Sequence, residues 1–168
     1  VSGLLRKEGF LEQAQDFLNK PHQKKSALIF IDLDNFKSVN DKLGHLTGDK
    51  AIKDAAEKLQ VIFSNYDIIS RFGGDEFCVL IKEIPDETLK EKLKWAVEKI
   101  HEVYTDGTES AEVTASIGVA ISPDYGTNIT TLIACADKAL YKAKEMGKNK
   151  FIFFSSALTL EGYNGEQR

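Results

Sequence analysis

The stretch "RFGGDEF", residues 71 to 77, joins two apolar segments through a pair of glycines. The flanking segments "DIISRF" (67–72) and "FCVLIK" (77–82) are typical of strands. A tight turn between them requires Gly73 and Gly74, because glycine reaches positive φ without a steric penalty. The stretch therefore predicts a β-hairpin.

The rest of the chain alternates helical and extended segments around this hairpin. Periodicity predicts helices at 4–18, 35–44, 48–63, from 85 to about 103 and 130–146, and further strands at 24–34, 113–121 and 151–154. The hairpin makes the sheet mixed rather than all parallel, so we predict an α+β fold with helices packed on a central sheet. Neither a GxGxxG motif nor a P-loop occurs, which excludes a Rossmann fold.

Composition narrows the class of protein. With 168 residues, 42% of them hydrophobic and 29% charged, the chain is predicted to be one soluble globular domain, 1–168. The net charge of -4 argues against a nucleic-acid binder, and no apolar run approaches transmembrane length. Because the chain opens on Val1, we expect a piece of a longer protein that is either cytoplasmic or the cytoplasmic portion of a membrane-anchored protein. In both cases we expect no direct membrane contact.

Four carboxylates are predicted to gather at one edge of the sheet. Asp32 and Asp34 leave the same face at the end of the first strand, and Asp75 and Glu76 follow the turn glycines. Adjacent like charges require a cation, and Mg²⁺ prefers carboxylate oxygens completed by water and phosphates. The alternatives are structural: Asp34 can cap the helix that starts at Asn35, and turn acids are often simply solvated.

Several residues suit a nucleotide triphosphate. Phe36 and Lys37 open a helix just after Asp32, where backbone N–H groups and a cation can meet phosphates. Lys144 and Lys148 lie one helical turn apart at the end of the last helix. Cations at a helix C-terminus also complement the helix dipole without any ligand, so the spacing of these two lysines fits either phosphate binding or a purely structural role.

An amide and a carboxylate are the pair needed to read the polar edge of guanine, and Asn40 and Asp49 offer them. Most surface Asn and Asp residues have no such role.

Taken together, these motifs resemble the GGDEF family of bacterial diguanylate cyclases. The matching blocks follow one another along nearly the whole chain: "SGLL" (2–5), "DLDNFKSVNDKLGHLTGD" (32–49), "RFGGDEF" (71–77), "TASIGVA" (114–120) and "ADKALYKAKEMGKN" (136–149). The resemblance implies a palm-like nucleotidyl cyclase fold with the hairpin turn at the active site. It also implies conversion of two GTP into cyclic di-GMP and two pyrophosphates, with two Mg²⁺ or Mn²⁺ ions per site.

The resemblance also implies a role for each matching residue. Asp32, Asp75 and the Leu33 carbonyl would bind the metals, and Glu76 would stabilise or deprotonate the reacting groups. The other implied contacts are guanine at Asn40 and Asp49, phosphates at Lys37, Lys144, Lys148 and the backbone of Asn35 and Phe36, and close approach of GTP at Gly73 and Gly74. Catalysis would require a homodimer, and a regulatory or sensor domain would precede Val1.

Two departures from the family pattern are visible. Arg6 and Lys7 stand where the family commonly has Asn-Arg, and Ser64 replaces the Arg of an inhibitory Arg-x-x-Asp site that keeps Asp67. Three other functions stay open: a GTP-binding signalling module without catalysis, a different nucleotidyl transferase on the same fold, and a plain interaction domain. The intact acids disfavour the first and third, and Asp49 favours guanine over adenine.

Overall fold

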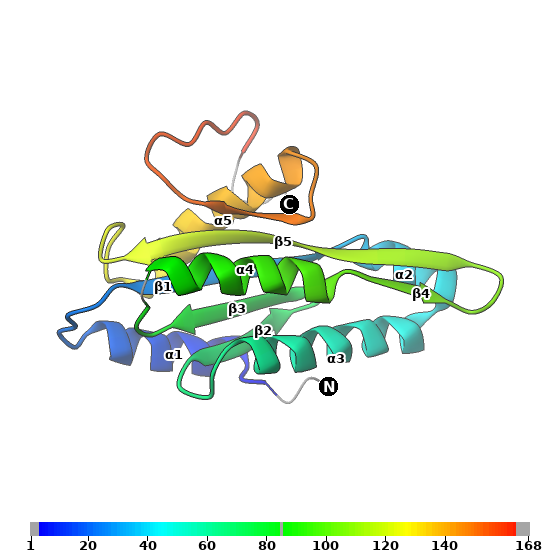
Figure 1. The fold of residues 1–168 in the computed structure, drawn as a ribbon, viewed down its shortest axis with the longest axis horizontal. Coiled ribbons are helices and arrows are strands. Elements are labelled where there is room, and N and C mark those ends of the chain that lie inside the picture. Colours follow the sequence, from blue (N-terminus) through cyan, green and yellow to red (C-terminus); the bar gives the residue numbers. More distant parts are fainter. Residues whose placement is uncertain (1–3, 85, 164–168) are drawn as a thin grey trace.

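The structure, a computed structural model, describes residues 4–84 and 86–163. Its helices are α1 (Lys7–Leu18), α2 (Phe36–Leu43), α3 (His45–Ile62), α4 (Asp86–Ile100) and α5 (Ile129–Glu145). Its strands are β1 (Ser26–Asp34), β2 (Ile68–Gly73), β3 (Glu76–Ile81), β4 (Glu102–Thr105), β5 (Ser110–Ser122) and β6 (Lys150–Phe153). Figure 1 shows how these elements are arranged.

The sheet is mixed, as predicted. Its strands run in the order β2-β3-β1-β5-β4, and β6 also pairs with the long strand β5. Strand β1 is antiparallel to both β3 and β5, whereas β6 is parallel to β5. The predicted hairpin joins β2 to β3. The predicted α+β fold, with helices packed on a central sheet, is confirmed.

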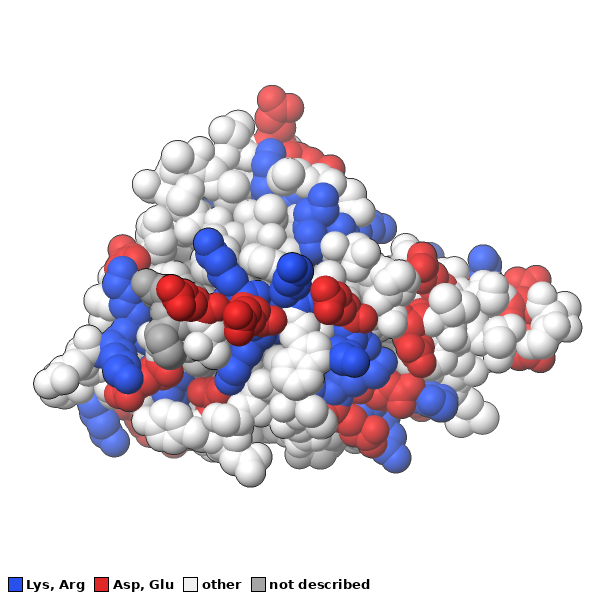
Figure 2. All heavy atoms as spheres, viewed as in Figure 1, with Lys and Arg blue, Asp and Glu red and all other residues white. Residues whose placement is uncertain are grey.

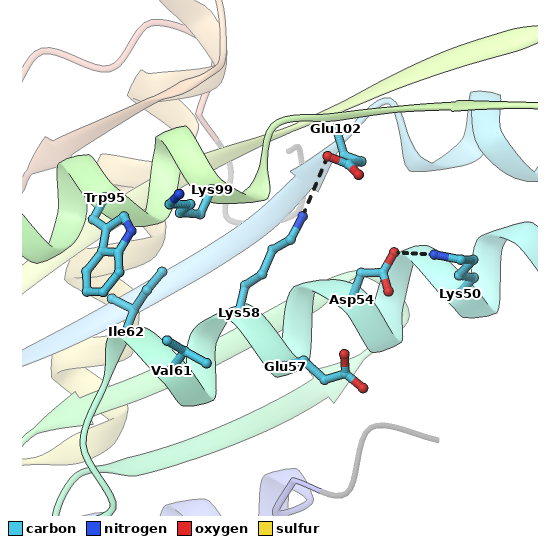
Figure 3. Close-up of a pocket in the computed structure, with 9 residues that line it drawn as sticks. All are labelled: Lys50, Asp54, Glu57, Lys58, Val61, Ile62, Trp95, Lys99 and Glu102. Carbon is cyan, nitrogen blue, oxygen red and sulfur yellow. Dashed lines mark hydrogen bonds and ion pairs between the residues drawn. The ribbon is translucent and has the colours of Figure 1, made fainter.

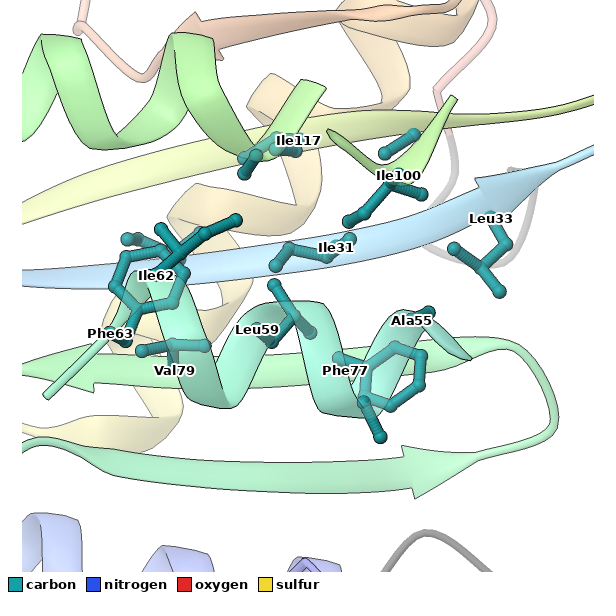
Figure 4. Packing of buried hydrophobic residues seen from close by; sticks show 14 of the residues in the cluster. Ile31, Leu33, Ala55, Leu59, Ile62, Phe63, Phe77, Val79, Ile100 and Ile117 are labelled. Carbon is teal, nitrogen blue, oxygen red and sulfur yellow. The ribbon is translucent and has the colours of Figure 1, made fainter. Parts of the chain in front are cut away.

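Helices cover both faces of the sheet because the apolar side chains of β1 alternate between them. Leu28 and Phe30 pack with α1 and α5, whereas Ile29 and Ile31 pack on the opposite face with α3 and α4. Figure 4 shows the core on the face covered by α3 and α4, in which Leu59 and Phe63 pack against side chains of the strands. All nine residues of β1 are buried, as expected for a central strand covered on two sides.

Strand β5 presents a large-residue face and a small-residue face, as its alternation predicts. Ile117 and Val119 join the core beneath α3 and α4. On the other face, a Cβ atom at Gly118 would lie 1.9 Å from the carbonyl oxygen of Ala136 and 2.4 Å from the backbone nitrogen of Leu140. Helix α5 therefore rests directly on the backbone of this strand.

Three predicted boundaries were wrong. The fourth helix was predicted to reach about residue 103, but α4 ends at Ile100, and Val103 lies in β4 and is 60% exposed. The first helix starts at Lys7 rather than residue 4, because Leu5 instead forms a parallel bridge to Ser70.

Helix α3 starts at His45 rather than Gly48, because Gly44, at φ 88°, turns the chain directly from α2 into it. Among the described residues, none of the helices combines the length and the apolar character that a membrane span requires.

Candidate active site

The hairpin turn holds its two glycines in left-handed backbone conformations. Gly73 has φ 143° and Gly74 has φ 52°, and a Cβ atom at either position would meet nothing within 4 Å. The Arg71 guanidinium donates to the Gly74 carbonyl from Nε (3.0 Å) and Nη2 (2.8 Å). The turn is thus fixed from within, and its outer surface is open to an incoming ligand.

The end of β1 brings Asp32 beside the turn acids. Asp32 pairs directly with Glu76 across the β1–β3 ladder, and the Leu33 N–H donates to the Asp75 carbonyl at 3.1 Å. Directly paired residues of neighbouring strands project to the same face. The sheet therefore gathers Asp32, Asp75 and Glu76 at one edge, where the sequence predicted them.

This arrangement perturbs Asp32 strongly. Burial raises the pKa of its carboxyl to about 7; Lys144 opposes the rise, and the charges of Asp75 and Glu76 add to it. Among the described residues, Asp32 Oδ1 is buried and has no hydrogen-bond partner. A buried carboxylate oxygen without a partner is costly unless a cation or another donor reaches it.

The neighbouring Asp34 takes neither of the roles considered from the sequence. Its side chain is fully buried and accepts hydrogen bonds from Thr114 Oγ1 (2.7 Å), Ser116 Oγ (2.7 Å), Lys144 Nζ (2.7 Å) and the Asn149 N–H (3.1 Å). Although burial opposes ionisation, these bonds and the Lys144 charge lower its pKa. The residue at the N-cap of α2 is Asn35, which makes no side-chain capping bond.

Lys144 supplies positive charge to Asp32 and Asp34. Its Nζ lies 2.7 Å from Asp34 Oδ1 and 3.2 Å from Asp32 Oδ2. Burial alone would lower the pKa of Lys144, but the two carboxylates outweigh burial and raise it. Lys148 is exposed in the turn that follows α5, and of these two lysines Lys144 is the one that forms ion pairs with Asp32 and Asp34.

The residues predicted to bind guanine form a second group at the α2–α3 corner. A Cβ atom at Gly48 would lie 1.8 Å from Asn40 Oδ1, so the Asn40 side chain lies across the first turn of α3. Asp49 follows Gly48 and is exposed. Lys37 on α2 and Asn35 are exposed as well, and Phe36 packs partly against the core. The corner leaves an open carboxylate beside a positioned amide.

The acids fit a hard divalent cation that is completed by a ligand. Within residues 4–84 and 86–163, no three His, Cys, Asp or Glu side chains are grouped so that they could hold a metal ion by themselves. Mg²⁺ commonly takes only one or two carboxylates and fills its other positions with water and substrate phosphates. The unpartnered oxygen of Asp32, beside Asp75 and Glu76, suits such an ion.

One pocket lies beside these acids, and another lies away from them. One, of about 550 Å³, includes Glu76 in its lining, between α1 and α5. Another, of about 560 Å³, lies between α3 and α4 and contains none of the predicted site residues (Figure 3). Two of its lysines pair with acids, Lys50 with Asp54 and Lys58 with Glu102. On the same side of the molecule, Figure 2 shows Lys and Arg side chains interspersed with Asp and Glu.

Sequence reasoning missed the partners of Asp34. Thr114, Ser116 and Asn149 were not considered as site residues, although the first two donate to the carboxylate and the third approaches it through its backbone. A signal was present in β5, where the hydroxyl residues Thr114 and Ser116 occupy alternate positions of a buried stretch. Such a pair on one face indicates a buried polar partner on the neighbouring strand.

Comparison with known proteins gives a consistent result. The family model described as "Diguanylate cyclase, GGDEF domain" matches residues 1–150. The chain is 40% identical over 138 residues to the bifunctional diguanylate cyclase/cyclic di-GMP phosphodiesterase MucR of Pseudomonas aeruginosa, covering 80% of this chain and 20% of that protein. It is 30% identical to the cyclic di-GMP phosphodiesterase PdeR of Escherichia coli, covering 92% and 23%. The chain thus spans about a fifth of the length of these relatives.

A solved structure agrees with the fold. The crystal structure of a sensory box/GGDEF family protein from Caulobacter crescentus superposes with a TM-score of 0.77 at 32% identity. The match covers 87% of this chain and 96% of that one.

Proposed function

Since this chain belongs to the GGDEF family of diguanylate cyclase domains, we propose that it condenses two GTP molecules into cyclic di-GMP. Each ribose 3′-oxygen forms a bond to the α-phosphorus of the other GTP. The bond from that phosphorus to the bridging oxygen breaks, and two pyrophosphates leave. The observation that carries this proposal is that Asp32 lies beside Asp75 and Glu76 at the turn. Among the described residues, the buried Oδ1 of Asp32 has no hydrogen-bond partner.

The side chains divide the work between charge, orientation and proton transfer. Asp32, Asp75 and the Leu33 carbonyl would hold Mg²⁺ or Mn²⁺, two ions per site. When bound, these ions supply positive charge to the triphosphate and lower the pKa of the attacking hydroxyl. Glu76, beside Asp32, accepts the proton of the 3′-hydroxyl directly or through water.

The remaining contacts orient GTP. Asn40 and Asp49 receive the guanine edge at the α2–α3 corner. Lys37, Lys144, Lys148 and the N–H groups of Asn35 and Phe36 hold the phosphates. The open surface of Gly73 and Gly74 lets the nucleotide approach the backbone.

Assembly is part of this proposal. Each domain holds one GTP, so both bonds form only when two copies face one another as a homodimer. We place this domain, 1–168, in the cytoplasm as part of a longer signalling protein with an upstream regulatory domain. It needs neither nucleic acid nor direct membrane contact for the reaction.

One experiment separates the candidate functions. The domain, fused to a dimerising leucine zipper, is incubated with Mg²⁺ and GTP, and the products are separated by chromatography. We expect cyclic di-GMP with two pyrophosphates for each molecule, and none from a folded Asp75→Ala variant. GTP binding without product would identify a non-catalytic signalling module. This alternative is retained because one relative is named as a phosphodiesterase and not as a cyclase. A mononucleotide or mixed product would identify a different transferase.

A further inference from the structure

The acceptor capacity of Asp34 is fully used. Oδ1 accepts from Ser116 Oγ and Lys144 Nζ, each at 2.7 Å, and Oδ2 accepts from Thr114 Oγ1 at 2.7 Å and the Asn149 N–H at 3.1 Å. An ionised carboxylate offers about four lone-pair positions. Because all four are occupied and the side chain is fully buried, Asp34 has no position left for a metal ion.

Two of these donors belong to the end of α5. The helix closes with Lys148 N–H donating to Ala143 O (2.9 Å) and Gly147 N–H donating to Lys144 O (3.3 Å), the pair of bonds of a Schellman motif. Lys144 lies in the last turn of this helix, and Asn149 lies just beyond it. Asp34 therefore holds the segment 144–149 at both of its ends.

The segment between these two contacts has an uncommon backbone. Gly147, Lys148 and Asn149 have φ values of 112°, 66° and 53°. Left-handed conformations are costly for residues other than glycine and persist when the surroundings fix them. The bond from the Asn149 N–H to Asp34 is one such constraint, and it fixes the residue that follows the exposed Lys148.

We propose that Asp34 is a positioning residue for the triphosphate, acting through Lys144 and through the turn that carries Lys148. This inference rests on the proposed function, because it needs phosphates at those two lysines. Lys144 Nζ lies nearer to Asp34 (2.7 Å) than to Asp32 (3.2 Å), so Asp34 would keep the ammonium group in place beside the phosphates. Asp32 would then be available to hold a metal ion.

The test measures binding rather than turnover. The ligand is 3′-deoxy-GTP with Mg²⁺, which lacks the attacking hydroxyl, and its dissociation constant is measured by calorimetry. We expect Asp34→Asn to weaken binding about tenfold, the usual scale for a lost charge-assisted hydrogen bond. If Asp34 acts through these two lysines, adding Asp34→Asn to a Lys144→Met/Lys148→Met variant weakens binding no further.

A matched control is available on α3. Asp54 also pairs with a lysine, Lys50 at 2.9 Å, and accepts a hydroxyl bond from Tyr104 at 2.7 Å. Asp54→Asn should lower the melting temperature and leave the dissociation constant unchanged. If Asp34→Asn does not fold, Ser116→Ala removes one donor from Oδ1; we expect binding about two- to fivefold weaker, with no added loss in the Lys144→Met background.

The possible results separate this inference from the function beneath it. Binding by the unaltered domain together with a further loss when Asp34→Asn is added to the Lys144→Met/Lys148→Met variant, or with no loss from Asp34→Asn alone, would overturn the positioning role alone. Absence of 3′-deoxy-GTP binding by the unaltered, folded domain would overturn the proposed function, and the inference with it.

Discussion

Replacing Asp32 by asparagine should stabilise the metal-free domain at neutral and alkaline pH while abolishing its turnover. Burial, with the charges of Asp75 and Glu76, raises the pKa of Asp32 from the ordinary aspartate value of 3.8 to about 7, despite Lys144. Between these values the folded chain keeps a proton that the unfolded chain has lost. The free energy of unfolding therefore falls as the pH rises through this window, and Asp32→Asn removes that fall.

The size of the effect follows from the same numbers. Between pH 5 and about 7, an interval of roughly two pH units, the Asp32 carboxyl stays protonated in the folded chain and is ionised in the unfolded chain. Each unit lowers the free energy of unfolding by about 1.36 kcal/mol. The stability of the variant relative to the unaltered domain should thus increase by about 3 kcal/mol between pH 5 and pH 8. The attraction of Lys144 is already contained in the raised pKa.

Urea unfolding in EDTA, followed by the fluorescence of the single tryptophan, Trp95, measures this difference. Asp54→Asn is the control. Lys50 and Tyr104 outweigh burial and lower the pKa of Asp54, so the stability that ionised Asp54 contributes is lost only when the pH falls below the pKa of an ordinary aspartate. Its loss should be constant between pH 5 and pH 8. If the free energies of unfolding of Asp32→Asn and the unaltered domain also differ by a constant amount between pH 5 and pH 8, the assignment of the raised pKa is refuted.

Three further outcomes are expected. Asp49→Ala should weaken GTP binding and blunt discrimination against ATP, because an unpaired guanine edge is penalised in a site built to pair it; unchanged preference in parallel titrations would count against this role. Without a tether, specific activity should fall on dilution, since two sites must meet; a constant value over a hundredfold dilution would contradict the dimer requirement. Cyclic di-GMP should bind weakly at the 64–67 turn, because Asp67 already accepts from Ser64 there (3.3 Å) and serine lacks the guanidinium fork of arginine; submicromolar calorimetric binding lost in Asp67→Ala would disprove it.

Sequence reasoning succeeded where one local pattern determined one element. The unbroken apolar run of β1, the glycine turn and the two-sided alternation of β5 each predicted an observed strand. Strand β4 was missed because it has four residues, and Val103 also fits the helical spacing of the preceding segment. Short segments of this kind are decided by their neighbours, here by pairing with β5.

The acids were placed by strand geometry, since alternation puts Asp32 and Asp34 on one face and the hairpin brings Asp75 and Glu76 beside that strand. Their different environments were not predictable in this way. The partners of Asp34 lie 80 to 115 positions further along the chain, and they reach it only because β5 pairs with β1 and α5 ends above both strands. Whether a carboxylate is saturated or left with a bare oxygen is decided by that tertiary placement.

The contact at Gly118 gives the domain a point of failure that touches no ligand. A single added methyl group would press on the backbone of α5 at Ala136 and Leu140, so the helix must lift or the strand must bend. Lys144 lies one turn beyond Leu140 on this helix, and either movement would carry its ammonium group away from Asp34. Gly118→Ala would therefore resemble an active-site lesion in an assay, although it alters only the spacing between two backbones.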